Sequence, residues 1–260
     1  MQTSDLAMVA IQAALEAGDL LKKGFSTNFS VSNKEGKQNL VTEYDKASEK
    51  CIIESIKKRF PGHGFLAEES GDSGNASSEI VWVIDPLDGT VNFAYGIPFF
   101  SVSIAAVQGD LPLAGVVYNP LLGELFFAEK GKGAYFNGKR MSVSNKTDLD
   151  KSLLATGFPY NVEKNPNSCI DHVTKVLSMG IPIRRLGSAA LDLSYIACGR
   201  FDAYWEMGLH PWDIAAGKLL VEEAGGMVTH YDGSNRPINS STNILATNKK
   251  LHGAMMNILR

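Results

Sequence analysis

The first half of the chain combines two amphipathic helical patterns with a series of short apolar runs. Apolar residues recur at helical spacing over residues 5–24 and 45–60, which predicts two helices that each bury one face. A Gly/Ser/Asn-rich stretch at residues 72–78 is expected to form a loop. Alternating runs separated by turn residues predict an antiparallel meander, with strands at residues 99–107, 113–118, 125–129 and 134–136.

In the second half of the chain, short apolar strands alternate with helical patterns. This order is typical of an α/β arrangement, unlike the α+β pattern of the first half. The charge-rich segment 145–151 is the best internal boundary, so we expect an N-terminal α+β lobe at residues 1–145 and a C-terminal α/β lobe at residues 146–260. Strands are predicted near residues 153–156, 183–186, 201–206, 227–229 and 244–246, and helices at residues 166–178, 188–198 and 213–224.

A Pro/Gly turn with two carboxylates follows the apolar run 80–84. The strand is expected to stop at Asp85, because Pro86 has no N–H to donate to a neighbouring strand. Asp85 and Asp88 offer hard oxygen ligands, and Mg²⁺ prefers one or two carboxylates together with substrate phosphate. If a helix begins here, the backbone N–H groups of Asp88 to Thr90 can cradle that phosphate. Asp-Pro and Asp-Gly are also ordinary turn signals, so the turn alone leaves a purely structural alternative open.

Two more acidic segments accompany this turn, and together the three resemble a known family. Glu68-Glu69-Ser70 lies upstream, and Trp212-Asp213 lies downstream. In this order, residues 66–70, 85–93 and 206–217 resemble the inositol monophosphatase family of Mg²⁺-dependent, Li⁺-sensitive phosphatases. The likeness covers nearly the whole chain, to Gly226. It implies an α/β fold organised as a five-layered α-β-α-β-α sandwich.

The resemblance also implies a set of metal ligands. Asp85 would bridge two Mg²⁺ ions, with Glu68 and the Leu87 carbonyl completing the first site and Asp88 and Asp213 the second. A weaker third ion is implied near Glu68. For Asp213, a position near a helix N-terminus is an alternative reading that is compatible with ligation.

The implied catalytic residues orient a water molecule. Glu68 and Thr90 would position the attacking water, and Asp45 would support Thr90 through a hydrogen bond. A structural alternative for Asp45 is the N-cap of the helix that follows it. No side-chain nucleophile is required.

Substrate contacts are implied mainly in the second half of the chain. Glu206 would accept hydrogen bonds from inositol hydroxyls, although a surface glutamate at a strand end is an alternative. Lys34, in a loop expected at residues 34–38, matches a basic residue near the mouth of the site. The other implied substrate contacts are Asp88, Gly89, Thr90, Gly187, Ser188, Ala189 and Asp213.

The chemistry itself favours several metal-binding carboxylates. Hydrolysis of a phosphate monoester can need an acceleration of ~10²¹, or roughly 29 kcal/mol. One general base contributes only ~10²–10⁴. Metal ions that bind the phosphoryl oxygens, the leaving oxygen and the attacking water can supply more.

The composition of the chain argues against several other classes of protein. The chain has 260 residues, of which 44% are apolar, and a net charge of −3. There is no strong basic block for nucleic acid, no apolar stretch approaching the ~20 residues that span a membrane, and no pattern of a signal peptide. The three cysteines form neither a disulfide framework nor a zinc motif, so a reducing, cytoplasmic location is expected.

The most favoured function is hydrolysis of myo-inositol 1-phosphate. The segment 184–193 and Pro211 look more like bacterial members of the family than animal ones, so other substrates remain open. The alternatives are fructose 1,6-bisphosphate, histidinol phosphate and adenosine bisphosphates, or a non-catalytic role in a transcription complex. Relatives are usually homodimers, and the resemblance implies the same here.

Overall fold

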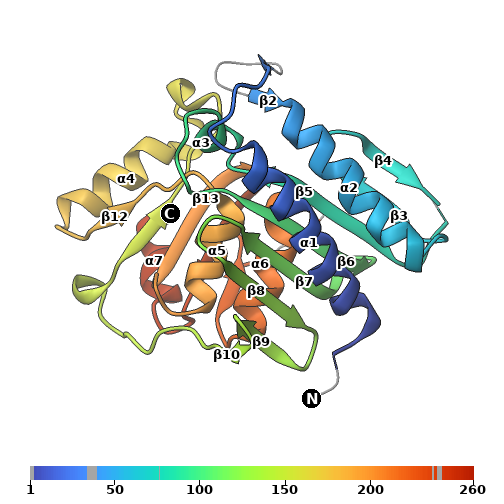
Figure 1. Cartoon of the computed structure of the whole chain (residues 1–260). Coiled ribbons are helices and arrows are strands. Elements are labelled where there is room, and N and C mark those ends of the chain that lie inside the picture. The colour runs from blue at the N-terminus through green and yellow to red at the C-terminus, as the bar shows by residue number, and fades with distance from the viewer. Residues whose placement is uncertain (1–2, 34–39, 76, 236, 239–241) are drawn as a thin grey trace.

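The helices and strands stack in five layers (Figure 1). The computed structural model describes residues 3–33, 40–75, 77–235, 237–238 and 242–260. Helices α1 (Asp5–Gly24) and α2 (Glu43–Arg59) lie side by side and form the first layer. The buried face of α1 consists largely of alanines, such as Ala10, Ala13 and Ala17, which let the helix approach strands β6 (Ser101–Gln108) and β7 (Leu111–Asn119) closely.

The second layer is an eight-stranded sheet with the order β10-β9-β8-β7-β6-β5-β3-β4. Strands β6 to β9 pair in sequence as antiparallel neighbours, so the predicted meander is confirmed. The other strands of this sheet are β3 (Gly64–Ala67), β4 (Gly71–Gly74), β5 (Val81–Asp88), β8 (Glu124–Glu129), β9 (Gly133–Phe136) and β10 (Lys139–Arg140).

Two local predictions for this sheet were wrong. The segment expected to be a loop at 72–78 instead begins with β4, which pairs antiparallel with β3. The strand expected to stop at Asp85 continues to Asp88, because the chain bulges past Pro86 and resumes its pairing with β6. A sheet tolerates proline at a bulge, because the residues in the bulge do not form hydrogen bonds with the neighbouring strand.

The third layer consists of α5 (Ala189–Ala197) and α6 (Pro211–Glu223) and contacts both sheets. Small residues let α6 pack closely on the first sheet and on α5. A Cβ atom at Gly115 of β7 would lie 3.0 Å from Ala216 Cα, and one at Gly217 would lie 2.5 Å from Leu193 Cδ1. The buried core around these helices therefore joins residues from both halves of the chain.

The last two layers are a five-stranded sheet and the helices α4 (Cys169–Ser178) and α7 (His252–Leu259). Val176 and Met255 of these helices share a buried cluster with Trp205 of the sheet. The five-layered α/β fold is thus confirmed, whereas the division at residue 145 stays a prediction. The strand order is β12-β11-β13-β15-β14, with β11 (Leu154–Thr156), β12 (Ile183–Arg184), β13 (Ala203–Leu209), β14 (Met227–Thr229) and β15 (Thr242–Thr247).

The remaining elements are short. Strands β1 (Val31–Asn33) and β2 (Leu40–Thr42) pair antiparallel, and α3 (Thr90–Ala94) follows β5. Lys34 and the loop expected around it lie outside the described residues. In the described part of the chain, no helix combines the length and the apolar character needed to cross a membrane.

Candidate active site

A cavity of about 810 Å³ lies where β5 and β13 meet the first residues of α3, α5 and α6. The structure brings nearly all of the predicted site residues to this cavity. Asp45 stands apart from the lining, directly behind Thr90. The predicted residues that line it are Glu68, Asp85, Leu87, Asp88, Gly89, Thr90, Gly187, Ser188, Ala189, Glu206 and Asp213.

Thr90 and Asp45 are in direct contact. The Thr90 hydroxyl lies 2.9 Å from Asp45 Oδ1 and 3.0 Å from the Leu87 carbonyl oxygen. The other carboxylate oxygen of Asp45 accepts hydrogen bonds from the backbone N–H and hydroxyl of Thr42. Thr42, and not Asp45, is the N-cap of α2, so the alternative that made Asp45 the N-cap was wrong. Asp45 closes a capping box from the third helical position and contacts Thr90 at the same time.

Asp88 joins the first half of the chain to α5. Its Oδ2 accepts hydrogen bonds from Ser188 Oγ (2.6 Å) and from the N–H of Ala190 (2.8 Å). Burial raises the pKa of Asp88 to about 6, although these hydrogen bonds lower it. The carboxylate therefore helps to hold the N-terminus of α5 against β5.

The carboxylates of the cavity repel one another. Burial raises the pKa of Asp85 well above its ordinary value, and the charges of Glu68, Asp88 and Asp213 add to this. The pKa of Asp213 is raised by burial and then by Asp88 and Glu68. Asp213 occupies the third position of α6, where its Oδ2 accepts the His210 N–H at 2.6 Å, so the expected place near a helix N-terminus is confirmed.

A bound divalent cation would relieve this repulsion, and hard oxygen donors are the ligands that Mg²⁺ prefers. The donor set therefore fits such an ion. Within the described ranges, no three acidic, histidine or cysteine side chains are already placed to hold an ion by themselves. Water and substrate oxygens would complete the coordination, as is usual for Mg²⁺.

Glu206 lines the cavity from β13, and its carboxylate lies against Gly157. It receives a hydrogen bond from the buried hydroxyl of Tyr204, and a Cβ atom at Gly157 would lie 2.2 Å from its carboxyl carbon. Burial raises the pKa of Glu206 to about 7, against the opposing effect of Tyr204. Asp192 lies nearby, and one of its carboxylate oxygens is buried and has no hydrogen-bond partner among the described residues.

Two glycines let the loops of the site approach each other. Gly89 and Gly187 have φ values of +96° and +83°, which side chains rarely adopt. A Cβ atom at Gly89 would lie 3.2 Å from the carbonyl oxygen of Gly187. Asn92 fixes this contact, because its amide Nδ2 donates to the carbonyls of Phe99 (2.7 Å) and Leu186 (2.8 Å).

Several residues that support the site were not predicted from the sequence. Ser48, Glu49, Asn92 and Gly157 each contact a part of the chain distant from their own, and Tyr204 contacts Glu206 on the same strand. Of these residues, only Ser48 and Glu49 could have been predicted from the sequence. They follow Asp45 at helical spacing and place polar groups on one face of α2.

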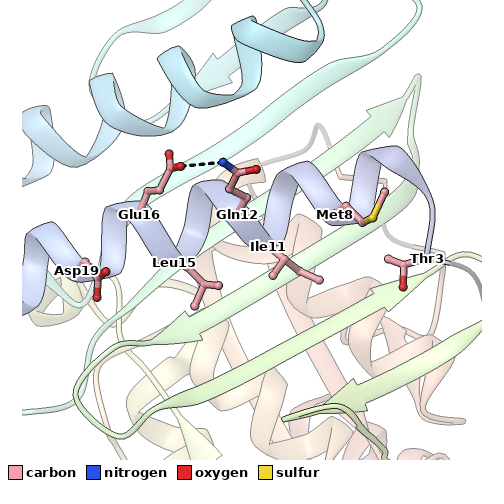
Figure 2. A pocket seen from close by; sticks show the side chains of 7 residues that line it. All are labelled: Thr3, Met8, Ile11, Gln12, Leu15, Glu16 and Asp19. Carbon is pink, nitrogen blue, oxygen red and sulfur yellow. Dashed lines mark hydrogen bonds between the residues drawn. The ribbon is translucent and has the colours of Figure 1, made fainter.

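A second hollow, of about 400 Å³, lies along the outer face of α1 (Figure 2). Met8, Ile11 and Leu15 line it, and Gln12 donates a 2.9 Å hydrogen bond to Glu16 beside them. None of the predicted site residues reaches this hollow, so it is separate from the acidic cavity.

The fold and the cavity define a layered α/β protein whose site is built from acidic residues and helix N-termini. A family model of the inositol monophosphatase family matches residues 2–260, and the chain belongs to this family. Membership in this family supports the assignment of the protein as a phosphatase.

Curated relatives and a solved structure agree with this assignment. The chain is 44% identical to the Nus factor SuhB of Escherichia coli (strain K12) over 254 residues, which cover 97% of this chain and 94% of that protein. It is 45% identical over 245 residues to the inositol-1-monophosphatase of Synechocystis sp., covering 94% and 85% of the two chains. The crystal structure of the extragenic suppressor protein suhB from Bartonella henselae superimposes with a TM-score of 0.93, at 41% identity and 99% coverage of both chains.

Proposed function

We propose that this protein hydrolyses a small phosphate monoester, with myo-inositol 1-phosphate as the preferred substrate, and that it requires Mg²⁺. The observation that carries the proposal is the convergence of Glu68, Asp85, Asp88 and Asp213 from separate segments on one cavity. The similarity to the Synechocystis inositol-1-monophosphatase supports the choice of substrate.

The ligand assignment proposed from the sequence is retained. Asp85 would be shared by two ions, Glu68 and the Leu87 carbonyl would serve the first, and Asp88 and Asp213 the second; a third ion near Glu68 would bind more weakly. When bound, Mg²⁺ supplies positive charge that polarises the phosphoryl oxygens and lowers the pKa of water.

The chain's own residues would orient the reactants. Thr90, whose hydroxyl is fixed by Asp45, lines the cavity together with Glu68, and these groups would direct a water molecule toward phosphorus. Gly89 would contact the phosphate through its backbone; a side chain here would instead meet the backbone of Phe99 and Gly187, at 3.1 and 3.2 Å from its Cβ atom.

Substrate discrimination would rest on residues that the second half of the chain contributes to the cavity. Glu206 would accept hydrogen bonds from the hydroxyl groups of the polyol, and Tyr204 would fix its orientation. Gly187, Ser188 and Ala189 would contact the same substrate, mainly through their backbone.

A substrate panel tests the proposal. Purified protein with Mg²⁺ is assayed for phosphate release from inositol 1-phosphate, fructose 1,6-bisphosphate, histidinol phosphate and an adenosine bisphosphate. We expect the highest kcat/KM for inositol 1-phosphate. A higher value for another ester would move the substrate assignment, and no release from any of them would overturn the function.

A second candidate role is binding within a transcription complex, which is suggested by the relatives named Nus factor SuhB. Purified RNA polymerase and its elongation factors, mixed with the tagged protein, test this role. Stable association without Mg²⁺ would support it, and no association at any Mg²⁺ concentration would rule it out.

A further inference from the structure

Helix α2 presents three polar side chains on the face that it turns toward the site. Ser48 follows Asp45 by three residues and Glu49 follows it by four, so all three share one side of the helix. All three are buried, and Ile52 and Ile56 continue the same buried face further along the helix. The first half of this face is therefore polar although it lies inside the protein, where polar groups are costly unless they are hydrogen-bonded.

Each of these side chains bonds a different segment of the site. Asp45 holds Thr90, as described above. Ser48 Oγ donates a 2.7 Å hydrogen bond to the carbonyl oxygen of Pro86. Glu49 Oε2 accepts a 2.8 Å hydrogen bond from the backbone N–H of Glu69.

Ser48 and Glu49 bond the chain at two places where strand pairing is interrupted. Pro86 lies in the bulge, where β5 and β6 skip their pairing. Glu69 lies in the turn between β3 and β4, one residue after Glu68, whose N–H still bonds the Ile84 carbonyl oxygen of β5 at 3.1 Å. In both places, a side chain of α2 forms a hydrogen bond with the backbone where strand pairing is interrupted.

We propose that Ser48 and Glu49 are positioning residues that set the affinity for the divalent cation; this inference rests on the proposed function. Ser48 fixes the turn that carries Asp85 and the Leu87 carbonyl. Glu49 fixes the turn that carries Glu68. Because these turns approach from different strands, α2 holds the ligands of one ion at a constant separation.

The physical reason is conformational entropy. A turn without these hydrogen bonds samples more backbone conformations, and an ion that binds must then order it. Part of the binding free energy is lost in that step, so affinity falls while the ligands themselves are unchanged.

Mg²⁺ binding measured by calorimetry tests the proposal without any substrate. We expect Ser48→Ala and Glu49→Ala to weaken binding by about tenfold or more, the usual effect of removing groups that orient metal ligands. The same variants should need correspondingly more Mg²⁺ for half-maximal phosphate release, and should keep most of their kcat once Mg²⁺ saturates.

Two further variants act as controls. Glu49→Gln keeps an oxygen that can accept the Glu69 N–H but removes the charge, so binding close to the wild-type value is expected. Glu54→Ala removes an exposed glutamate of the same helix, which pairs with Lys50 at the surface, and should leave binding unchanged. Ser48→Ala deletes a single oxygen atom, so it keeps the test valid if Glu49→Ala fails to fold.

Wild-type affinity in both alanine variants would overturn the inference. Weak binding by Glu49→Gln, equal to that of Glu49→Ala, would also overturn it for Glu49, because the charge and not the hydrogen bond would then matter. If the wild type binds Mg²⁺ and the variants bind it weakly, but no ester is hydrolysed, the positioning role stands and the phosphatase function fails. If the wild type binds no Mg²⁺, both fail.

Discussion

At the scale of single residues, the acidic side chains of the site form hydrogen bonds that stabilise the fold, and they also lie in or beside the cavity. Asp45 closes the capping box of α2 and contacts Thr90. Asp88 accepts hydrogen bonds from the start of α5, and Asp213 accepts one from the start of α6. A structural role of these residues therefore does not compete with a chemical role. A helix N-terminus that needs an acceptor also places that acceptor beside the cavity.

Gly157 determines where the Glu206 carboxylate can lie. A methyl group at this position would lie 2.0 Å from Glu206 Oε2, so Gly157→Ala must displace the carboxylate. We expect KM for inositol 1-phosphate to rise about tenfold, the value of one hydrogen bond to a charged group at ~1.5 kcal/mol, with kcat little changed. Steady-state kinetics check this. An unchanged KM would show that Glu206 does not contact the substrate.

Glu206 should also make stability depend on pH. Its pKa is 4.5 in an unfolded chain and about 7 in the folded protein, because burial disfavours the charged form. The folded state therefore holds the proton more tightly, so the contribution of this group to stability is complete below pH 4.5 and is lost as the pH rises toward 7.

Glu206→Gln cannot ionise and should keep that contribution. We expect its Tm to match the wild type near pH 4.5 and to exceed it increasingly up to pH 7. Thermal unfolding at several pH values, without Mg²⁺, provides the comparison. A Tm difference that is constant with pH would contradict the assignment.

The sequence predicted acidic residues that line the cavity but not most of the residues that support them. Asp85, Asp88 and Asp213 stand out because acidic residues at strand ends and helix starts have a local signature. Asn92 and Gly157 have none. Their importance lies in contacts with distant segments, namely the bond from Asn92 to Leu186 and the close approach of Glu206 to Gly157, which no local pattern encodes.

At the scale of elements, local sequence patterns predicted the long helices and strands. They failed where a strand contains residues that strands usually exclude. The meander was predictable because alternation and turn residues agree along it. Strand β4 was missed because its Gly-Asp-Ser-Gly sequence has low strand propensity, and only its pairing with β3 makes it a strand. The continuation of β5 past Pro86 likewise depends on the neighbouring β6.

The contact between α3 and the segment before α5 should depend on Asn92. Asn92→Ala removes the donor to two partly buried carbonyl oxygens, so we expect the free energy of unfolding to fall by about 1–3 kcal/mol. Chemical denaturation measures this. Asn257→Ala, at an exposed position of α7, is a matched control with an expected change within about 0.5 kcal/mol. Equal effects of both variants would contradict the role assigned to Asn92.

At the scale of the whole molecule, the helical layer of α5 and α6 joins the two sheets. These helices come from the second half of the chain, yet they pack on β6 and β7 of the first half. Neither sheet could lose this layer without exposing its core, so the fold depends on contacts between the proposed halves.

We therefore expect the two halves to unfold together. Trp82 reports on the first sheet and Trp205 on the second, and both are fully buried. Variants that keep only one of these tryptophans, with the other two of the chain replaced by phenylalanine, should show coincident denaturation curves. Separate midpoints would mean that the halves at residue 145 are independent units.

The central claim is that the acidic cavity binds Mg²⁺ for hydrolysis, and Asp85→Asn tests it most directly. Asparagine keeps the shape and an oxygen for the Leu87 N–H, now bonded to Asp85 at 3.0 Å, but it removes the charge. The variant should be at least as stable as the wild type without Mg²⁺, because a buried carboxylate with a raised pKa has been neutralised.

The decisive measurement is the rate of phosphate release from inositol 1-phosphate by the wild type and by Asp85→Asn across a Mg²⁺ titration. We predict Mg²⁺-dependent release by the wild type and a loss of at least ~100-fold in the folded variant, since metal ligation is worth several kcal/mol in such reactions. Equal release by both proteins, or release by the wild type that persists without Mg²⁺, would contradict the account.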